Sequence, residues 1–187
     1  MVGSGAAGLR AALEARRAGV RVLLVSKGRT GLGNVTAVAG GGIVAPFGHA
    51  DPRDNPDVYF EDTLASGRGL CDPELVRIFV NEACREILHL QQLGLAFRME
   101  PDGRFVQLYQ PGHSFPRDCK VAGPSRTESW VPTFEGGRLL SMSLKKAAAQ
   151  IGVECLERTI VFDLCSDNLG IAGAIGVDET MNLIVIE

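Results

Sequence analysis

The feature that most constrains this chain is a run of closely spaced glycines at its amino end. Residues 3–8 read Gly-Ser-Gly-Ala-Ala-Gly and stand between a two-residue apolar stub and a segment rich in helix-forming residues. In this pattern the first glycine permits a tight turn, the second lets the backbone approach a pyrophosphate, and the third lets the helix pack closely. A helix that begins there presents free N–H groups and a positive dipole to a phosphate. The residues expected to hold the phosphates are therefore Gly3, Ser4, Gly5, Ala6, Ala7 and Gly8.

The next segments complete part of a βαβ unit. Residues 6–18 predict a helix that Gly19 ends, and the apolar, β-branched run 21–26 predicts a buried parallel strand. A strand usually needs five or six residues, whereas only Met1 and Val2 precede the first glycine. The first strand is therefore expected to be incomplete.

Further along, capping and periodicity predict additional helices and a group of strands. Asn55-Pro56 and Asp72-Pro73 each place a capping side chain before a proline, and the second pair opens the longest helix, 73–93. Its core stripe is expected to comprise Leu75, Phe79, Ala83, Ile87 and Leu90. A helix at 138–150, a strand at 153–156 and an antiparallel meander at 159–165, 171–177 and 183–186 follow. The fold class is α/β, a mainly parallel, Rossmann-like sheet with an antiparallel β-meander.

Composition excludes several classes of protein. The net charge of −3 and the 45% hydrophobic content argue against a nucleic-acid-binding surface and against disorder. No apolar run approaches the ~20 residues that span a bilayer, and no secretory signal is present, so a cytoplasmic location is expected. The five cysteines have neither disulfide-framework nor metal spacing and are expected to be buried thiols.

The end of the second strand leaves two ligands open. The acidic residue that binds a ribose hydroxyl in many such folds is missing, because no Asp or Glu lies between Glu14 and Asp51. Ser26 and Lys27 suit FAD, whereas Lys27 and Arg29 suit the 2′-phosphate of NADP. The second glycine cluster, in residues 30–43, favours an extended flavin.

Several motifs, taken in order, resemble one family. GSGAAGLRAA, SKG, a loop closing on GGI, EDTLASGRGLCDPELV, LQQLGLAF and PGHS are similar to the flavoprotein subunits of succinate dehydrogenase, fumarate reductase and L-aspartate oxidase. The resemblance runs through most of the 187 residues and implies an FAD-binding domain over 1–187. Residues 115–135 carry no family pattern.

The resemblance also implies the site. Ser4 to Ala7 would form the pyrophosphate loop, Ser26 and Lys27 would lie near the adenosine end, and Asp163 would lie beside the cofactor. Members with covalent flavin carry a His where this chain has Asn34, Val35 and Thr36, so FAD is expected to be non-covalent. His113 and Arg117 are candidates for contact with substrate or flavin. The stretch along the flavin ring would comprise Val35, Thr36, Ala37, Val38, Ala39, Gly40, Gly41 and Gly42.

Complete members of the family act on a small dicarboxylate or an amino acid through a separate capping domain. By that comparison the domain is expected to be incomplete at both ends and to lack catalysis alone. The substrate class would be of the fumarate, succinate or L-aspartate type, and an iron–sulfur partner protein stays open. Two alternatives remain: an NADP-dependent reductase, and a non-catalytic fragment that requires a partner chain.

Overall fold

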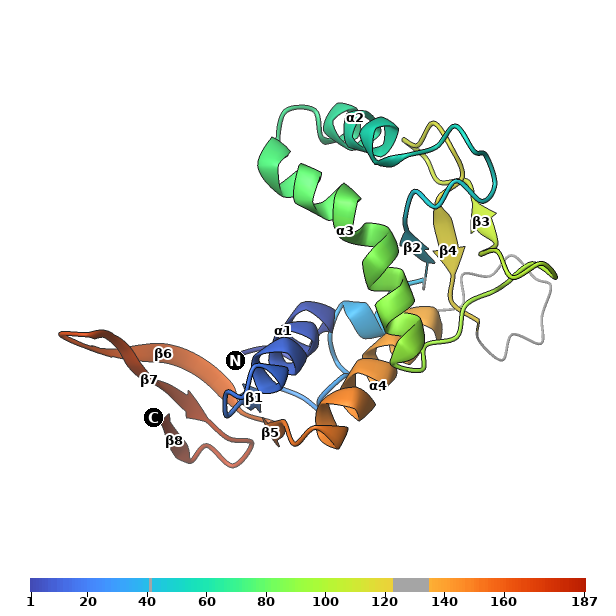
Figure 1. Cartoon of the computed structure of the whole chain (residues 1–187). Helices are drawn as coiled ribbons and strands as arrows, with labels where there is room; N and C mark the ends of the chain where they lie inside the picture. Colours follow the sequence, from blue (N-terminus) through green and yellow to red (C-terminus); the bar gives the residue numbers. More distant parts are fainter. Residues whose placement is uncertain (41, 123–134) are drawn as a thin grey trace. The chain divides into compact units, whose positions relative to one another are not determined.

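The computed structural model describes residues 1–40, 42–122 and 135–187 and divides into two compact units (Figure 1). The first unit comprises Met1–Ala39 and Leu140–Glu187, and the second comprises Gly40–Leu139. Each unit has its own sheets and its own buried residues.

A short parallel sheet forms the centre of the first unit. Strand β1 (Leu23–Val25) pairs in parallel with β5 (Glu154–Leu156), and Val2 forms an isolated parallel bridge with Val25 on the other edge. The amino-terminal stub therefore takes the place of the expected first strand. The strand predicted at 21–26 is shorter than expected but present.

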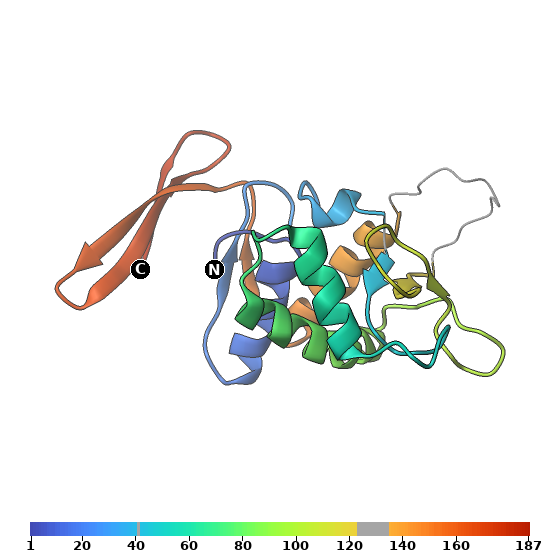
Figure 2. The same ribbon diagram turned by 90° about the horizontal axis from the view of Figure 1, so that it is seen from above.

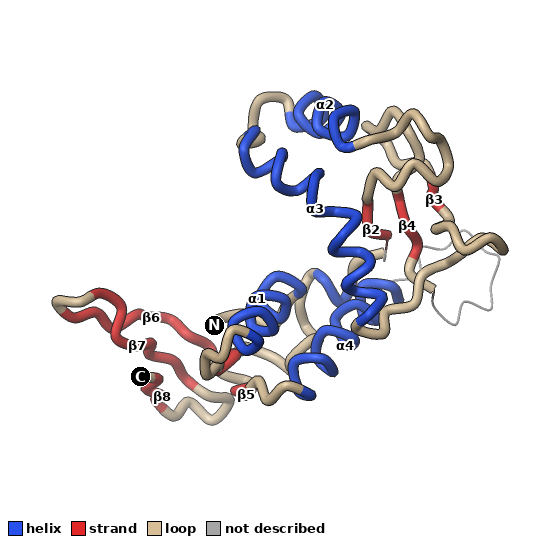
Figure 3. The backbone as a smooth tube through the Cα atoms, in the orientation of Figure 1, coloured by secondary structure: helices blue, strands red, loops and turns tan. Residues whose placement is uncertain are grey.

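Two helices of the first unit bury apolar side chains. Helix α1 (Ala6–Arg17) follows the glycine turn, and α4 (Glu135–Gln150) enters this unit from Leu140 onward (Figure 3). Helix α1 ends where Gly19 adopts a φ of +87°, and a glycine at φ +76° follows α4. The buried apolar side chains of this unit include Leu9, Leu13, Leu24, Leu144 and Ala148.

The meander predicted at the carboxyl end is present. Strands β6 (Ile160–Asp167), β7 (Gly170–Val177) and β8 (Leu183–Ile186) pair antiparallel in sequence order and form one twisted ribbon (Figure 2). Register shifts interrupt the β6–β7 ladder between Val161 and Asp163 and between Cys165 and Ser166. This sheet accounts for the turns expected near residues 168 and 179.

The second unit combines a helix pair with a small antiparallel sheet. Helices α2 (Pro56–Gly67) and α3 (Pro73–Gln92) are capped as predicted, because Asn55 and Asp72 each accept two backbone N–H groups of the first turn. Strands β2 (Gly42–Val44), β4 (Asp118–Lys120) and β3 (Gln107–Leu108) form a sheet in the order β2-β4-β3. Tyr59, Val76 and Val80 form its buried cluster, against which Val44 packs.

The predicted core stripe of the longest helix was wrong in part. Ala83 and Ile87 are buried, but Leu75 and Phe79 are 65% and 50% exposed. Val76 and Val80 are buried in their place, so the packed face is rotated by one residue. Tyr59 of α2 lies in the same cluster as these valines, and such a tertiary contact selects the face that is buried.

The cysteines are free, but they are not uniformly buried. Cys119 is buried, Cys155 is exposed, and the other three are intermediate. Burial raises the pKa of the Cys84 thiol to about 11 and that of Cys119 to about 12, so both stay protonated at neutral pH. In the part of the chain that the structure describes, no three His, Cys, Asp or Glu side chains gather to hold a metal, and no helix is long and apolar enough to cross a membrane.

Candidate nucleotide site in the first unit

The glycine turn has the geometry that its spacing predicted. Gly3 adopts a φ of +101° and donates its N–H to the carbonyl oxygen of Val25 at 2.8 Å, which ties the turn to β1. A Cβ on Gly8 would lie 1.9 Å from the carbonyl oxygen of Gly3, so the helix reaches this position only without a side chain. Helix α1 begins immediately afterwards, and its N-cap Gly5 supplies no side-chain cap. The first turn of α1 is thus held open to a ligand.

A cavity of about 260 Å³ opens at this turn. Its walls come from the turn itself, from the end of β1, from the following loop and from the start of β6. The glycine positions of the wall contribute backbone only, because a Cβ on Gly3 or Gly33 would meet nothing within 4 Å. The lining residues are Val2, Gly3, Ser4, Gly5, Val25, Ser26, Lys27, Leu32, Gly33, Asn34, Thr159, Ile160 and Val161.

Two serines pin the glycine turn to the end of β1. The hydroxyls of Ser4 and Ser26 lie 2.7 Å apart and are buried, and Ser4 Oγ also accepts the N–H of Gly31 at 3.3 Å. Ser26 was predicted to reach a ribose hydroxyl. In the structure its first partner is Ser4, so its contact with a ribose stays a prediction.

The loop after β1 folds back onto the start of α1. Asn34 donates from Nδ2 to the carbonyl oxygen of Ser4 at 3.3 Å and accepts the N–H of Ala37 at 3.0 Å. Thr36 Oγ1 accepts the N–H of Ala6 at 3.1 Å. These bonds fix a short 3-10 helix, η1 (Thr36–Val38), which the sequence did not predict. Asn34 was seen only as the absence of a histidine, but it holds the loop in place.

A carboxylate anchors the same loop from the other side. Glu157 accepts the N–H of Thr30 at 2.9 Å, and this bond, with Lys145 nearby, holds the pKa of Glu157 below its ordinary value. Thr30 is wholly buried, and its hydroxyl oxygen has no hydrogen-bond partner among the described residues. An unsatisfied buried hydroxyl beside the glycine turn is a polar group that a bound nucleotide or an ordered water would satisfy.

The site fits a dinucleotide by these observations. It combines an uncapped helix N-terminus, backbone-lined walls, one orphaned hydroxyl and the cation Lys27. Phosphate charge is favoured at such a helix start, and glycines allow the close backbone approach that a pyrophosphate needs.

The predicted flavin stretch is divided between the two units. Val35–Ala39 belongs to the first unit and Gly40 and Gly42 to the second, while Gly41 lies outside the described residues. Val35 and Val38 are 85% and 58% exposed, whereas Ala37 is buried. Two exposed valines on one short turn offer an apolar surface that a planar ring would cover.

The predicted Asp163 lies on β6, two residues beyond the lining residue Val161. Its side chain is exposed, and its carboxylate accepts the N–H of Leu164 at 2.9 Å. Its contact with a cofactor stays a prediction.

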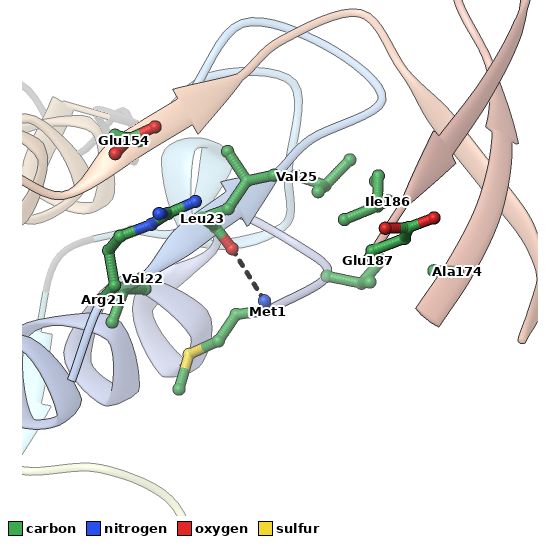
Figure 4. Close-up of a pocket in the computed structure, with 10 residues that line it drawn as sticks. Met1, Arg21, Val22, Leu23, Val25, Glu154, Ala174, Ile186 and Glu187 are labelled. Atoms are coloured by element: carbon green, nitrogen blue, oxygen red, sulfur yellow. Dashed lines mark hydrogen bonds between the residues drawn. The ribbon is translucent and has the colours of Figure 1, made fainter. Parts of the chain in front are cut away.

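A larger cavity of about 510 Å³ lies elsewhere in the first unit (Figure 4). It is lined by side chains around β1, among them Arg21, Leu23 and Val25, and by Glu154, Ile186 and Glu187. The amino group of Met1 donates there to the carbonyl oxygen of Leu23 at 2.8 Å. No helix N-terminus or glycine turn of the described chain lines it, so size alone does not mark the site.

His113 and Arg117 lie together in the second unit. Arg117 is wholly buried, and its guanidinium pairs with Asp54 at 2.7 Å and with Asp62 at 2.6 Å. It also donates to His113 Nδ1 at 3.2 Å and lies 4.7 Å from the ring centre of Tyr59. Such complete pairing suits a structural role for Arg117 better than contact with a substrate.

This cluster shifts the titration of its members. Burial lowers the pKa of His113, and the charge of Arg117 lowers it further. Burial raises the pKa of Tyr59 to about 12. Burial would also raise the pKa of Asp62, but the hydrogen bonds from Ser114 and Arg117 outweigh it and leave the pKa below its ordinary value. The sequence did not indicate these carboxylate partners, which lie 63 and 55 residues away in the chain.

Relatives of known kind share this architecture. The chain is 33% identical over 177 residues to a curated relative from Methanothermobacter marburgensis, a fumarate reductase (CoM/CoB) flavoprotein chain, and the match covers 95% of this chain and 30% of the relative. It is 34% identical over 170 residues to L-aspartate oxidase of Streptomyces coelicolor, covering 91% and 27%. The chain thus spans about 30% of the length of the curated relatives it matches.

Solved structures agree with the sequence relatives. Sdh1 of Mycobacterium smegmatis superposes with a TM-score of 0.85 at 28% identity, covering 100% of this chain and 31% of that one. Quinol fumarate reductase of E. coli superposes with a TM-score of 0.83 at 26% identity, covering 100% and 30%. Residues 1–184 match the FAD binding domain family. The cofactor is thereby FAD rather than NADP, and the chain belongs to the FAD binding domain family of fumarate reductase, succinate dehydrogenase and L-aspartate oxidase type flavoproteins.

Proposed function

We propose that the first unit holds the FAD diphosphate at the start of α1, with residues Ser4 to Ala7 around the pyrophosphate. Gly3 and Gly8 shape the turn, and Ser26 and Lys27 face the adenosine end. The observation that carries this proposal is the cavity of about 260 Å³ at an uncapped helix N-terminus that a Cβ on Gly8 would close. Main-chain N–H groups then bind the phosphates, and Lys27 adds a positive charge.

The flavin ring would lie along residues Val35 to Gly42, with Asp163 nearby. The exposure of Val35 and Val38 supports this placement, because an apolar ring covers apolar side chains favourably. We infer non-covalent FAD, since Asn34, Val35 and Thr36 offer no nucleophilic side chain comparable to a histidine. The bound flavin supplies hydride chemistry, while the chain positions it and excludes water.

The whole protein would act on a small dicarboxylate, of the fumarate, succinate or L-aspartate type. Similarity to a fumarate reductase chain and to L-aspartate oxidases supports this substrate class. An iron–sulfur partner protein is compatible with the same relatives. We propose no catalytic step for His113, because its Nδ1 is engaged by Arg117. A cytoplasmic location and the absence of a nucleic-acid partner belong to the same proposal.

A fluorescence titration with FAD tests the binding site. The wild-type chain is expected to bind FAD with a saturable change in flavin emission, and Gly8→Ala is expected to weaken binding at least tenfold. The added methyl group would force α1 away from the carbonyl oxygen of Gly3. Gly28→Ala is the matched control, because its Cβ would meet nothing nearer than 4.0 Å and it does not line the cavity.

The control separates loss of fold from loss of the site. Gly28→Ala should bind FAD like the wild type, and circular dichroism should show that both variants stay helical. A folded wild-type chain that leaves FAD emission unchanged, or a Gly8→Ala variant that binds as tightly as the wild type, would refute the proposal. Competition by NADPH at equal concentration would instead favour a nicotinamide nucleotide.

A further inference from the structure

Asp118 is a buried carboxylate with one oxygen left unpaired. It opens β4, its side chain is 1% exposed, and its Oδ2 accepts hydrogen bonds from Lys120 Nζ at 2.6 Å and from Gln110 Nε2. Its Oδ1 has no hydrogen-bond partner among the described residues. A buried carboxylate oxygen without a donor is costly, so an alternative side chain of similar size would be more stable there.

The unpaired oxygen lies against Gly42. A Cβ on Gly42 would lie 1.8 Å from Asp118 Oδ1, so only a glycine fits between this carboxylate and β2. The α-hydrogen of Gly42 therefore faces Oδ1, in the arrangement of a weak Cα–H···O contact. Lys120 pairs with Gly42 in the register of β2 and β4, so both charges of the ion pair flank this glycine.

Gly42 ends the glycine stretch that the proposed function places along the flavin. Its need for a glycine has a physical cause in this structure, namely the carboxylate behind it. A charge held in the interior acts on a nearby redox group through a low dielectric, and the reduced flavin carries more negative charge than the oxidised flavin.

We propose that Asp118 is a positioning residue that fixes the backbone of Gly42, and that the Asp118–Lys120 ion pair beside it sets the reduction potential of the bound flavin. This inference rests on the proposed function, because it requires FAD along residues Val35 to Gly42. Asp118 opposes the extra electrons of reduced flavin, and Lys120 stabilises them. The two charges therefore have opposite effects on the potential.

A potentiometric titration of the FAD-loaded chain tests the electrostatic part. Asp118→Asn should make the flavin potential more positive, and Lys120→Gln should make it more negative. Asp102→Asn is the control, since Asp102 is an exposed carboxylate in the same unit that pairs with Arg104. A merely structural role would move both variants in the same direction or leave the potential unchanged, and either result overturns the inference.

The packing part is tested without flavin by thermal unfolding. Gly42→Ala should lower the melting temperature of the wild-type chain and of Asp118→Asn, because both keep an atom at the Oδ1 position. The same change should be tolerated in Asp118→Ala, where that atom is gone. Equal cost of Gly42→Ala in all three backgrounds would overturn the positioning role. A folded wild-type chain that binds no FAD would overturn the proposed function and the electrostatic part, whereas the packing result stands separately.

Discussion

The guanidinium of Arg117 and the carboxylate of Asp54 form a two-point pair whose side chains are 0% and 1% exposed, although 63 residues separate them in the chain. The pair joins the loop before α2 to the start of β4. Both charges are thus removed from water and depend on each other.

Removal of one partner of this pair should unfold much of the second unit. Arg117→Ala leaves Asp54 buried without a counter-charge, and we expect a loss of about 3–5 kcal/mol in the free energy of unfolding. Arg53→Ala, which breaks an exposed pair with Asp51, should have little effect. Urea unfolding followed by circular dichroism measures both. Equal unfolding midpoints for the two variants would show that Arg117 is not a structural centre.

A pH dependence follows from His49. Its Nδ1 accepts the N–H of Phe105 at 2.9 Å, and burial, followed by the charge of Arg104, lowers its pKa from the ordinary value of 6.5. The folded state favours the neutral ring, so this contribution to stability is present above pH 6.5 and is lost as the pH falls through the lowered pKa. Urea midpoints between pH 8 and pH 5.5 should therefore fall with pH.

His49→Asn is the matched control for this pH dependence. Its side-chain oxygen retains an acceptor near the N–H of Phe105 but does not titrate. His113 shifts in the same direction, so the slope should become shallower without vanishing. An unchanged slope in His49→Asn would assign the effect to other groups.

The two buried serines should differ in what they contribute. Ser4→Ala removes bonds to both Ser26 and Gly31, whereas Ser26→Ala leaves the bond from Gly31 in place. We expect a cost of about 1 kcal/mol for Ser26→Ala and a larger cost for Ser4→Ala. A double-mutant cycle by urea unfolding should give coupling between the two positions, and additive losses would contradict the direct contact.

The attachment of the flavin is tested by denaturing the loaded chain. Because no histidine lies at residues 34–36, acid precipitation should leave all yellow colour in the supernatant. Flavin absorbance that remains in the washed pellet would show a covalent bond and refute this part of the proposal.

Local chemistry made much of this fold predictable. Helices α2 and α3 begin at Asn55 and Asp72 because the side chain of each caps its own helix, and the glycine turn is a local pattern of the same kind. The meander was predictable because its apolar runs alternate with turn residues. These signals lie within a few residues of the structure that they determine.

The missed features depend on contacts between distant residues. Strand β4 reads Asp-Cys-Lys, which has no strand pattern, and it forms because β2 and β3 pair with it from either side. The buried face of α3 follows from its packing with Tyr59 of α2. In the site, Thr159 to Val161 line the cavity although they lie more than 130 residues from Ser26. No local pattern indicates such partners.

Amide chemical-shift mapping with FAD tests the central claim most directly. In ¹H–¹⁵N spectra of the labelled chain, FAD should shift the amides of residues 3–8, 26–27 and 33–34 most strongly, because these N–H groups line the cavity or open α1. Shifts concentrated around Leu23, Glu154 and Ile186, at the larger cavity, or no shifts at saturating FAD, would contradict the account.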